Sequence, residues 1–168
     1  MPFNSNDAQA SGFSPAWKVI LYAGIAVAIL DIANAIIFWF IYRGTDPIVI
    51  FQSIASGLLG RDSFDGGIST GLLGAFLQFF ISSCIAAVFY LGSLLWPALL
   101  KKPALSGGIY GIGVYLFMNY IVVPLSQASP AVFRWPWFIT NFLGHILLVG
   151  MPVAFIARWV VSKHKSGW

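Results

Sequence analysis

Six polar side chains lie inside long apolar stretches, where such groups are costly and usually face the interior of a helix bundle. They are Asp31, Asn34, Gln78, Asn119, Asn141 and His145. Counted along helices that rise about 1.5 Å per residue, Asp31 and Gln78 both fall about 16 Å from the same membrane surface. Asn34 and His145 fall at about 12 Å, and the two remaining asparagines are shallower. We therefore expect one intramembrane polar cluster to which all four spans contribute.

Three kinds of chemistry fit such a cluster. The first is structural, because hydrogen bonds between membrane helices, each well under about 2 kcal/mol, hold bundles together. The second is a proton or solute site built on Asp31, Gln78 and His145, since a membrane-buried acid marks ion and proton pathways. The third is axial ligation of a haem or chlorin by His145, although His164 lies in the tail and no second histidine faces it. Beyond that last alternative, we expect no cofactor.

Catalytic and metal-binding patterns are scarce. The HExxH, CxxC and P-loop patterns do not occur in the sequence. The single cysteine, Cys84, can form neither an intrachain disulfide nor a cysteine-based metal site. One aspartate and one histidine at membrane depth are too few for catalytic machinery. We therefore predict neither an enzyme nor a metal site.

The composition predicts the elements that must position these side chains. Of the 168 residues, 59% are hydrophobic and only 8% are charged, against about a quarter charged in soluble domains. The chain is too hydrophobic to be disordered, and its nine Lys and Arg residues are too scattered to bind nucleic acid. Its expected surroundings are the lipid bilayer and other membrane proteins, including copies of itself.

Four apolar stretches are long enough to cross a hydrocarbon core of about 30 Å as helices. After a polar segment at 1–16, we expect spans at about 17–42, 67–95, 105–123 and 137–161. The predicted fold is an all-α, integral-membrane four-helix bundle that forms a single domain over 1–168. Pro124 is expected to end the third span, and Pro152 is expected to kink the fourth.

A short helix is expected at about 47–59, between the first two spans. Asp46 and Pro47 suit the cap and first turn of a helix, and Gly60 suits its end. The segment is too short to cross the membrane, so it should lie at the external surface. It is either a lid that caps the bundle or a gate over a cavity.

Small residues recur at helical spacing in three of the spans, a pattern that lets helix backbones approach closely in lipid. The glycines expected at these helix contacts are Gly24, Gly67, Gly71, Gly74, Gly107 and Gly111.

The basic residues predict the orientation of the chain, because short cytoplasmic loops carry an excess of Lys and Arg. The side that holds both termini carries Lys18, Lys101, Lys102, Arg158, Lys163 and Lys165, whereas the other side carries Arg43, Arg61 and Arg134. We therefore expect both termini to be cytoplasmic.

Roughly residues 67–160 resemble the YagU-like group of small bacterial inner-membrane proteins. The motifs that carry the resemblance are Gly74, Tyr90, Pro97, Gly107-Gly108, Gly111, Pro124-Leu125, Pro130, Pro136-Trp137, Gly144-His145 and Arg158. Gln78 stands where that group tends to have a histidine, so a histidine pair is not expected here. The resemblance implies a multi-spanning protein of the bacterial inner membrane and no particular reaction.

From the sequence alone, the first interpretation is a non-enzymatic protein that acts by association, as an accessory subunit of a larger membrane complex or as a homo-oligomer. Small size, aromatic outer faces and the lack of a complete site favour this interpretation. The alternative is a small proton-linked transporter or channel with an intramembrane site at Asp31, Gln78 and His145.

Overall fold

The computed structural model describes residues 15–129 and 133–165, and all regular elements in these ranges are helical. Their order is α1 (Pro15–Arg43), α2 (Pro47–Leu59), η2 (Gly60–Phe64), α3 (Gly67–Leu95), η3 (Pro97–Leu100), α4 (Pro103–Phe117), η4 (Met118–Val122), α5 (Val123–Leu125), α6 (Trp135–Gly144), η5 (His145–Gly150) and α7 (Met151–Lys165). The segments η2 and η3 are 3-10 turns, and η4 and η5 are π-helical. Most of the predicted polar segment 1–16 lies outside the described residues.

Four helices are long and apolar enough to cross a membrane, as the composition predicted. They are Pro15–Arg43, Gly67–Leu95, Pro103–Leu125 and Trp135–His164, of 29, 29, 23 and 30 residues. The third runs through α4, η4 and α5, and the fourth runs through α6, η5 and α7. The all-α four-helix architecture of a membrane protein is thereby confirmed, and each helix extends the expected span by no more than a few residues.

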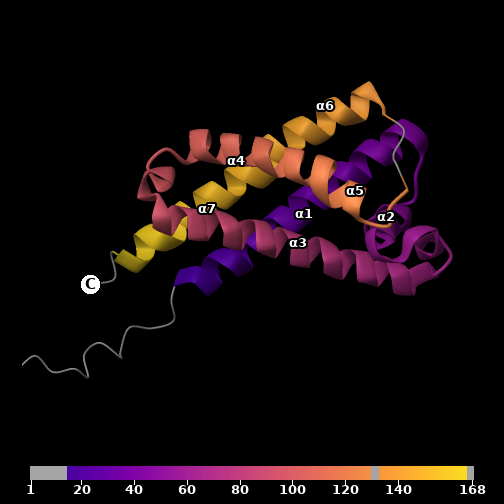
Figure 1. Cartoon of the computed structure of the whole chain (residues 1–168), viewed down its shortest axis with the longest axis horizontal. Coiled ribbons are helices and arrows are strands. Elements are labelled where there is room, and N and C mark those ends of the chain that lie inside the picture. Colours follow the sequence, from indigo (N-terminus) through magenta and orange to yellow (C-terminus); the bar gives the residue numbers. More distant parts are fainter. Residues whose placement is uncertain (1–14, 130–132, 166–168) are drawn as a thin grey trace, which may run out of the picture.

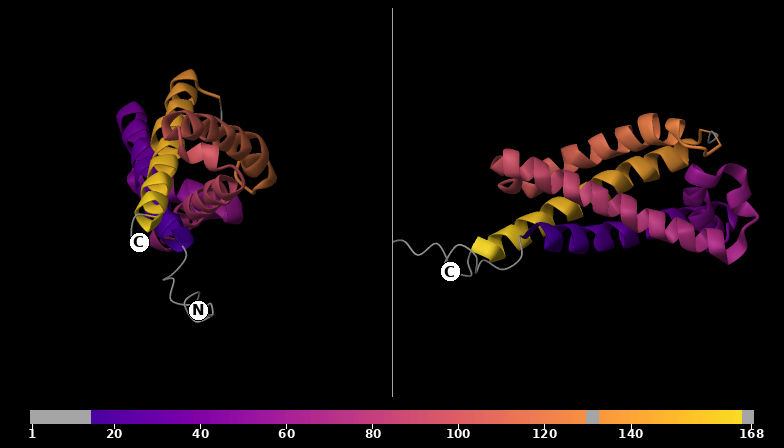
Figure 2. Two further views of the ribbon diagram at one scale, coloured as in Figure 1. Left: turned by 90° about the vertical axis from the view of Figure 1, so that its left-hand side faces the viewer. Right: turned by 60° about the horizontal axis from the view of Figure 1, so that its bottom comes forward.

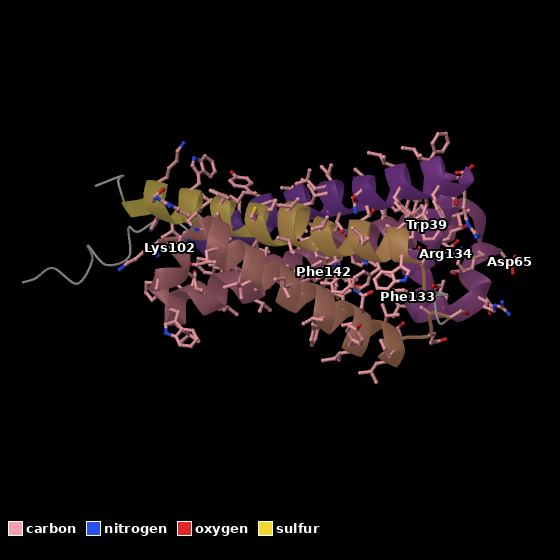
Figure 3. All side chains as sticks on the ribbon, turned by 90° about the horizontal axis from the view of Figure 1, so that it is seen from above. Trp39, Asp65, Lys102, Phe133, Arg134 and Phe142 are labelled. Carbon is pink, nitrogen blue, oxygen red and sulfur yellow. The ribbon has the colours of Figure 1, made fainter. Side chains whose placement is uncertain are left out.

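The four long helices form an elongated bundle (Figures 1 and 2). The helix α1 packs against α3 and α7, and α4 packs against η5 and α7. The start of α1 and the end of α7 lie at one end of the bundle, whereas α2 lies at the other (Figure 1). Figure 3 shows Lys102 at the first end and Asp65 and Arg134 toward the second, with the apolar length of the bundle between them.

The buried core is built mainly from small and β-branched side chains. Its fully enclosed members include Val19, Ala23, Val27, Ala86, Val149, Val153, Ala154 and Ala157. Larger apolar side chains such as Ile41, Ile68 and Leu95 are exposed on the outside. This distribution suits a bundle in lipid, where close packing of small residues holds helices together.

Five of the six glycines expected at helix contacts lie at close approaches between elements. A Cβ on Gly24 would be 2.6 Å from Ser83 Oγ, and a Cβ on Gly71 would be 3.1 Å from Ile48 Cγ1. Gly74 lies against the backbone of Phe51 in α2. Gly107 and Gly111 lie against the backbone of η5, where Gly150 fits between them.

Gly67 differs from the expectation. It has a φ of 56°, and a Cβ built on it would meet nothing within 4 Å. Its role is therefore conformational, because it begins α3 with a backbone that favours glycine. The small-residue spacing in the sequence could not separate this turn position from the packing positions that follow it.

Each π-helical segment is followed by one residue and then a proline. Pro124 follows η4, and Pro152 follows η5. A proline inside a helix lacks the N–H donor, and its ring collides with the carbonyl four residues earlier. A π turn is wider than an α turn and relieves this crowding. Pro124 lies at the end of the third span, as expected, although the helix continues through it to Leu125.

The helix α2 is fixed at its start and along its buried side. Asp46 accepts a hydrogen bond from the amide of Ile48 at 3.0 Å, as its cap position predicted. Gln52 is 5% exposed, and its Nε2 donates to the carbonyl of Gly67 at 3.1 Å. These contacts hold α2 against the start of α3.

Candidate functional site

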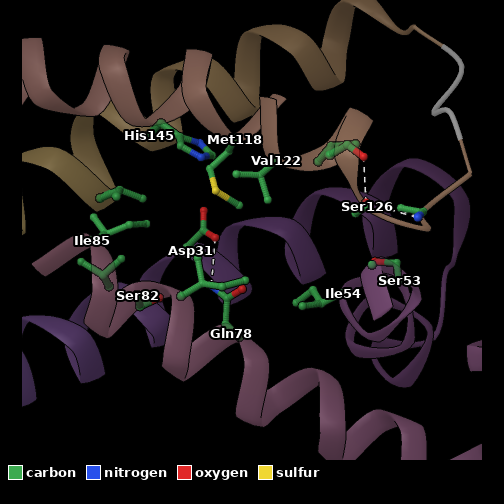
Figure 4. Close-up of a pocket in the computed structure, with 16 residues that line it drawn as sticks. Asp31, Ser53, Ile54, Gln78, Ser82, Ile85, Met118, Val122, Ser126 and His145 are labelled. Carbon is green, nitrogen blue, oxygen red and sulfur yellow. Dashed lines mark hydrogen bonds between the residues drawn. The ribbon is translucent and has the colours of Figure 1, made fainter. Parts of the chain in front are cut away.

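A cavity of about 230 Å³ lies inside the bundle, in the part that adjoins α2 (Figure 4). Its walls come from α1, α2, α3, η4, η5 and the segment after α5. Its polar lining consists of Asp31, Ser53, Gln78, Ser82, Ser126 and His145. Most of the remaining lining is aliphatic, so these few polar groups dominate the chemistry that the cavity offers.

Asp31 on α1 meets Gln78 on α3 across the cavity. Gln78 Nε2 donates a hydrogen bond to Asp31 Oδ2 at 2.9 Å. Within the described residues, neither Asp31 Oδ1 nor Gln78 Oε1 has a hydrogen-bond partner, and both atoms are acceptors when the acid is ionised. Asp31 and Gln78, which the sequence places at equal depth, are therefore in contact, and each keeps an oxygen that can accept a further hydrogen bond.

His145 lines the cavity from the first position of η5. Its Nδ1 lies 2.9 Å from the carbonyl oxygen of Asn141, and because a carbonyl can only accept, Nδ1 carries the hydrogen. In the neutral imidazole, Nε2 is then an acceptor. The ring also packs edge-on against Tyr115, with 5.4 Å between centroids. Figure 4 shows the His145 ring beside Met118. The carboxyl group of Asp31 points toward that side of the cavity.

The helix α2 forms one wall of the cavity, through Ser53, Ile54 and Gly57. The amide of Gln127 donates to the carbonyl of Gly57 at 3.0 Å, which ties α2 to the segment after α5. Ser53 Oγ donates to the carbonyl of Ile50 at 2.7 Å, inside its own helix. The short helix therefore covers a cavity, which is the arrangement that a gate requires.

The six polar residues expected in one cluster are divided among three places. Asp31, Gln78 and His145 share the central cavity. Asn119 and Asn141 line a second cavity of about 530 Å³ that also contains Arg134.

Asn34 lies apart from both groups, on the side of α1 that faces α6. A Cβ built on Gly144 would be 2.8 Å from Asn34 Nδ2. The expectation of a single cluster is thus met by three residues and not by the other three, because equal depth does not fix the direction in which a side chain points.

Ser82 and Met118 belong to the cavity and were not expected there. Ser82 is 1% exposed and lies one helical turn after Gln78, so spacing along α3 was the signal that could have found it. Met118 begins η4, and its position depends on the π turn, which no simple pattern predicts. Ser53 and Ser126 also line the cavity.

A Gly-x-Ser-x-Gly pattern occurs at Gly67-Ile-Ser-Thr-Gly71. In hydrolases this pattern places the serine on a sharp turn between a strand and a helix. Here a 3-10 turn precedes it, and Ser69 lies exposed in the first turn of α3. The context that would make the serine a nucleophile is absent at this position.

Metal and haem ligation have little support in the geometry. The described part of the chain contains no group of three His, Cys, Asp or Glu side chains that could hold a metal ion. At about 230 Å³, the central cavity is smaller than the roughly 300–1,000 Å³ typical of pockets for drug-sized ligands. A haem or chlorin ring bound through His145 would not fit within it.

Comparisons with known proteins give no relative. No family model, no curated protein and no solved structure matches the chain significantly. The resemblance to the YagU-like group therefore stays a prediction, and function must be inferred from the geometry of the site.

Proposed function

We propose that this protein is a small membrane transporter or channel that carries a cationic or hydrogen-bond-donating solute through the cavity at Asp31. The observation that supports this proposal is open space beside the polar side chains. A bundle held together by Asp31, Gln78 and His145 alone would close around them, yet a cavity of about 230 Å³ remains. It has room for several water molecules, each of which takes about 30 Å³ in the liquid.

The lining suggests what the solute must offer. Gln78 uses one of its two Nε2–H donors on Asp31, and His145 uses its Nδ1–H on a backbone carbonyl. The atoms left to the cavity are mainly acceptors, namely Asp31 Oδ1, Gln78 Oε1 and His145 Nε2. A small ammonium group or a hydrated proton would satisfy these acceptors and the negative charge of an ionised Asp31.

The test is flux in proteoliposomes. Vesicles that contain a trapped pH indicator are given methylammonium under an imposed proton gradient, and the proton flux that it evokes is measured. We expect Asp31→Asn to remove this flux and Asp62→Asn, at an exposed position in η2, to leave it unchanged. Equal flux through both variants would refute the proposal, provided that both variants retain the wild-type unfolding midpoint.

Association with other membrane proteins is the second candidate. Aromatic side chains on the outside of α3 favour it: Phe76 and Phe80 are 62% and 55% exposed, and their rings stack with 6.4 Å between centroids. Replacing both by leucine should then reduce the mass of the particle that gentle detergents extract. A monomer in the wild-type protein, measured by light scattering, would exclude stable association.

The proposed orientation places both termini in the cytoplasm of a bacterial cell. Lys101 and Arg158 lie close together at the end where α1 begins, since Arg158 Nη1 donates to the carbonyl of Lys101 at 3.3 Å. Arg43 and Arg61 flank α2, toward the other end. The distribution of charge supports this orientation. A C-terminal reporter that is active only inside the cell is the expected result, and activity outside would reverse the topology.

A further inference from the structure

An apolar groove runs between α3 and α4 in the middle of their spans. Its volume is about 400 Å³, and its lining includes Phe80, Cys84, Val88, Gly113 and Phe117. The helices α3 and α4 do not pack closely against each other along this length. They are joined by Tyr110, whose hydroxyl donates to the carbonyl of Ile85 at 2.7 Å and whose ring packs edge-on against Phe89. The groove lies in parts of the spans that would be surrounded by hydrocarbon.

The groove and the central cavity share part of their walls. Ile81, Ile85, Met118 and Val122 line both. These four side chains form the wall that the groove shares with the cavity at Asp31 and Gln78. Met118 is unbranched and has a flexible thioether side chain, and it stands at the start of the widened turn η4. Such a side chain can change its rotamer without a movement of the helix.

We propose that the solute is a hydrophobic amine, which enters from the bilayer through this groove. Its ammonium group occupies the cavity at Asp31, and its hydrocarbon tail lies in the groove between α3 and α4. The unused acceptors at Asp31, Gln78 and His145 suit the head, and the aliphatic and aromatic lining suits the tail. This inference rests on the proposed transport function and narrows it to a class of substrate.

Gly113 offers a way to fill the groove without disturbing the bundle. A Cβ built on it would meet nothing within 4 Å, so a large side chain would extend into the groove. Ile109, on the same helix, is 63% exposed and lies outside the lining, so it provides the matched control position. Gly113→Trp thus places an indole inside the groove, whereas Ile109→Trp places the same group on α4 outside it.

The experiment compares methylammonium with octylammonium in the proteoliposome flux assay. Each methylene of the tail that leaves water should strengthen the apparent affinity, referred to the aqueous concentration, about fourfold. We expect Gly113→Trp to weaken octylammonium at least tenfold while leaving methylammonium unchanged, and Ile109→Trp to change neither. If methylammonium acts but Gly113→Trp leaves octylammonium unaffected, the groove inference fails and the proposed function stands. If methylammonium evokes no flux in the wild-type protein, the proposed function itself fails.

Cys84 provides a direct reading of the groove, because it is exposed there and is the single cysteine of the chain. In lipid nanodiscs, octylammonium should slow the reaction of Cys84 with N-ethylmaleimide several-fold, and methylammonium should not. No protection at octylammonium concentrations that saturate the flux would overturn the inference. A smaller particle mass for Gly113→Trp than for the wild type would also overturn it, because the groove would then hold a helix of a partner protein.

Discussion

The contact between α4 and η5 predicts opposite outcomes for the same substitution at two neighbouring glycines. At Gly111, an added Cβ would lie 2.8 Å from Ile146 Cα and 2.9 Å from the carbonyl carbon of His145. Carbon atoms are at their best separation at about 3.5–4.0 Å. Because the obstructing atoms are backbone, Gly111→Ala can be accommodated only if η5 moves away by roughly 0.5–1 Å, which forfeits a quarter to a half of each contact along the interface.

The expected magnitude follows from two terms. Overpacking of this kind costs about 1–3 kcal/mol, and the rigid backbone obstruction places Gly111→Ala near the upper end. Alanine in place of glycine inside a helix returns about 0.5–1 kcal/mol. Gly113→Ala gains the second term without the first, since its Cβ meets nothing. We therefore expect Gly111→Ala to lower the free energy of unfolding by about 2 kcal/mol and Gly113→Ala to leave it equal or slightly higher.

The assay is an SDS titration of the protein in mild detergent, followed by far-UV circular dichroism. The difference between the two variants isolates the clash, because the gain in helix propensity is common to both. Indistinguishable unfolding curves for Gly111→Ala and Gly113→Ala would refute the close packing of α4 on η5.

Three further predictions concern the cavity and its cover. Gln78→Leu removes the donor to Asp31 and should lower the free energy of unfolding by about 0.6–1.7 kcal/mol in the same titration, whereas Gln127→Leu, at an exposed position, should have no effect. Asp46→Ala removes the cap of α2, which is worth about 1 kcal/mol. Amide hydrogen exchange should become faster in the first turn of α2 and stay the same in α4. Equally faster exchange in both helices would contradict a local role for Asp46. Pro152→Ala supplies the missing N–H and removes the ring, so η5 should close to α geometry. Because η5 holds one extra residue, this closure should rotate α6 by about 100° relative to α7 and re-aim His145. Methylammonium flux should fall several-fold with no loss of helicity, and unchanged flux would count against the role of the π turn.

The length and composition of the chain predicted the helices well, because a run of apolar residues long enough to cross lipid has few other structures open to it. Asp46, Pro47 and Gly60 marked the bounds of α2, since capping and helix termination depend on the few residues at each end of the helix. Depth along a helix is also nearly a property of the sequence. It correctly suggested that Asp31 and Gln78 could meet.

The direction in which side chains point was not predictable in the same way. Asn34 is only one turn beyond Asp31, yet it faces α6 rather than the cavity. Asn141 and His145 are also one turn apart and line different cavities, and the helix changes from an α to a π turn at His145. Such rotations depend on how helices pack and on where a widened turn forms. The two prolines indicated that the helices would be disturbed, but not in what form.

The widened turns also bear on how the length of this chain can vary. A π-helical segment holds one more residue than an α-helical segment with the same ends. Deleting one residue from Met118–Val122 or from His145–Gly150 would therefore return the turn to α geometry and leave the helix on either side facing its present neighbours. A deletion in the middle of α1 would instead rotate every following residue of the span by about 100°. Of these two places, η5 packs closely against Gly107 and Gly111, so single-residue shortening is tolerable at η4, which supplies Met118 to the cavity. A chain shortened there could keep its bundle and lose its site.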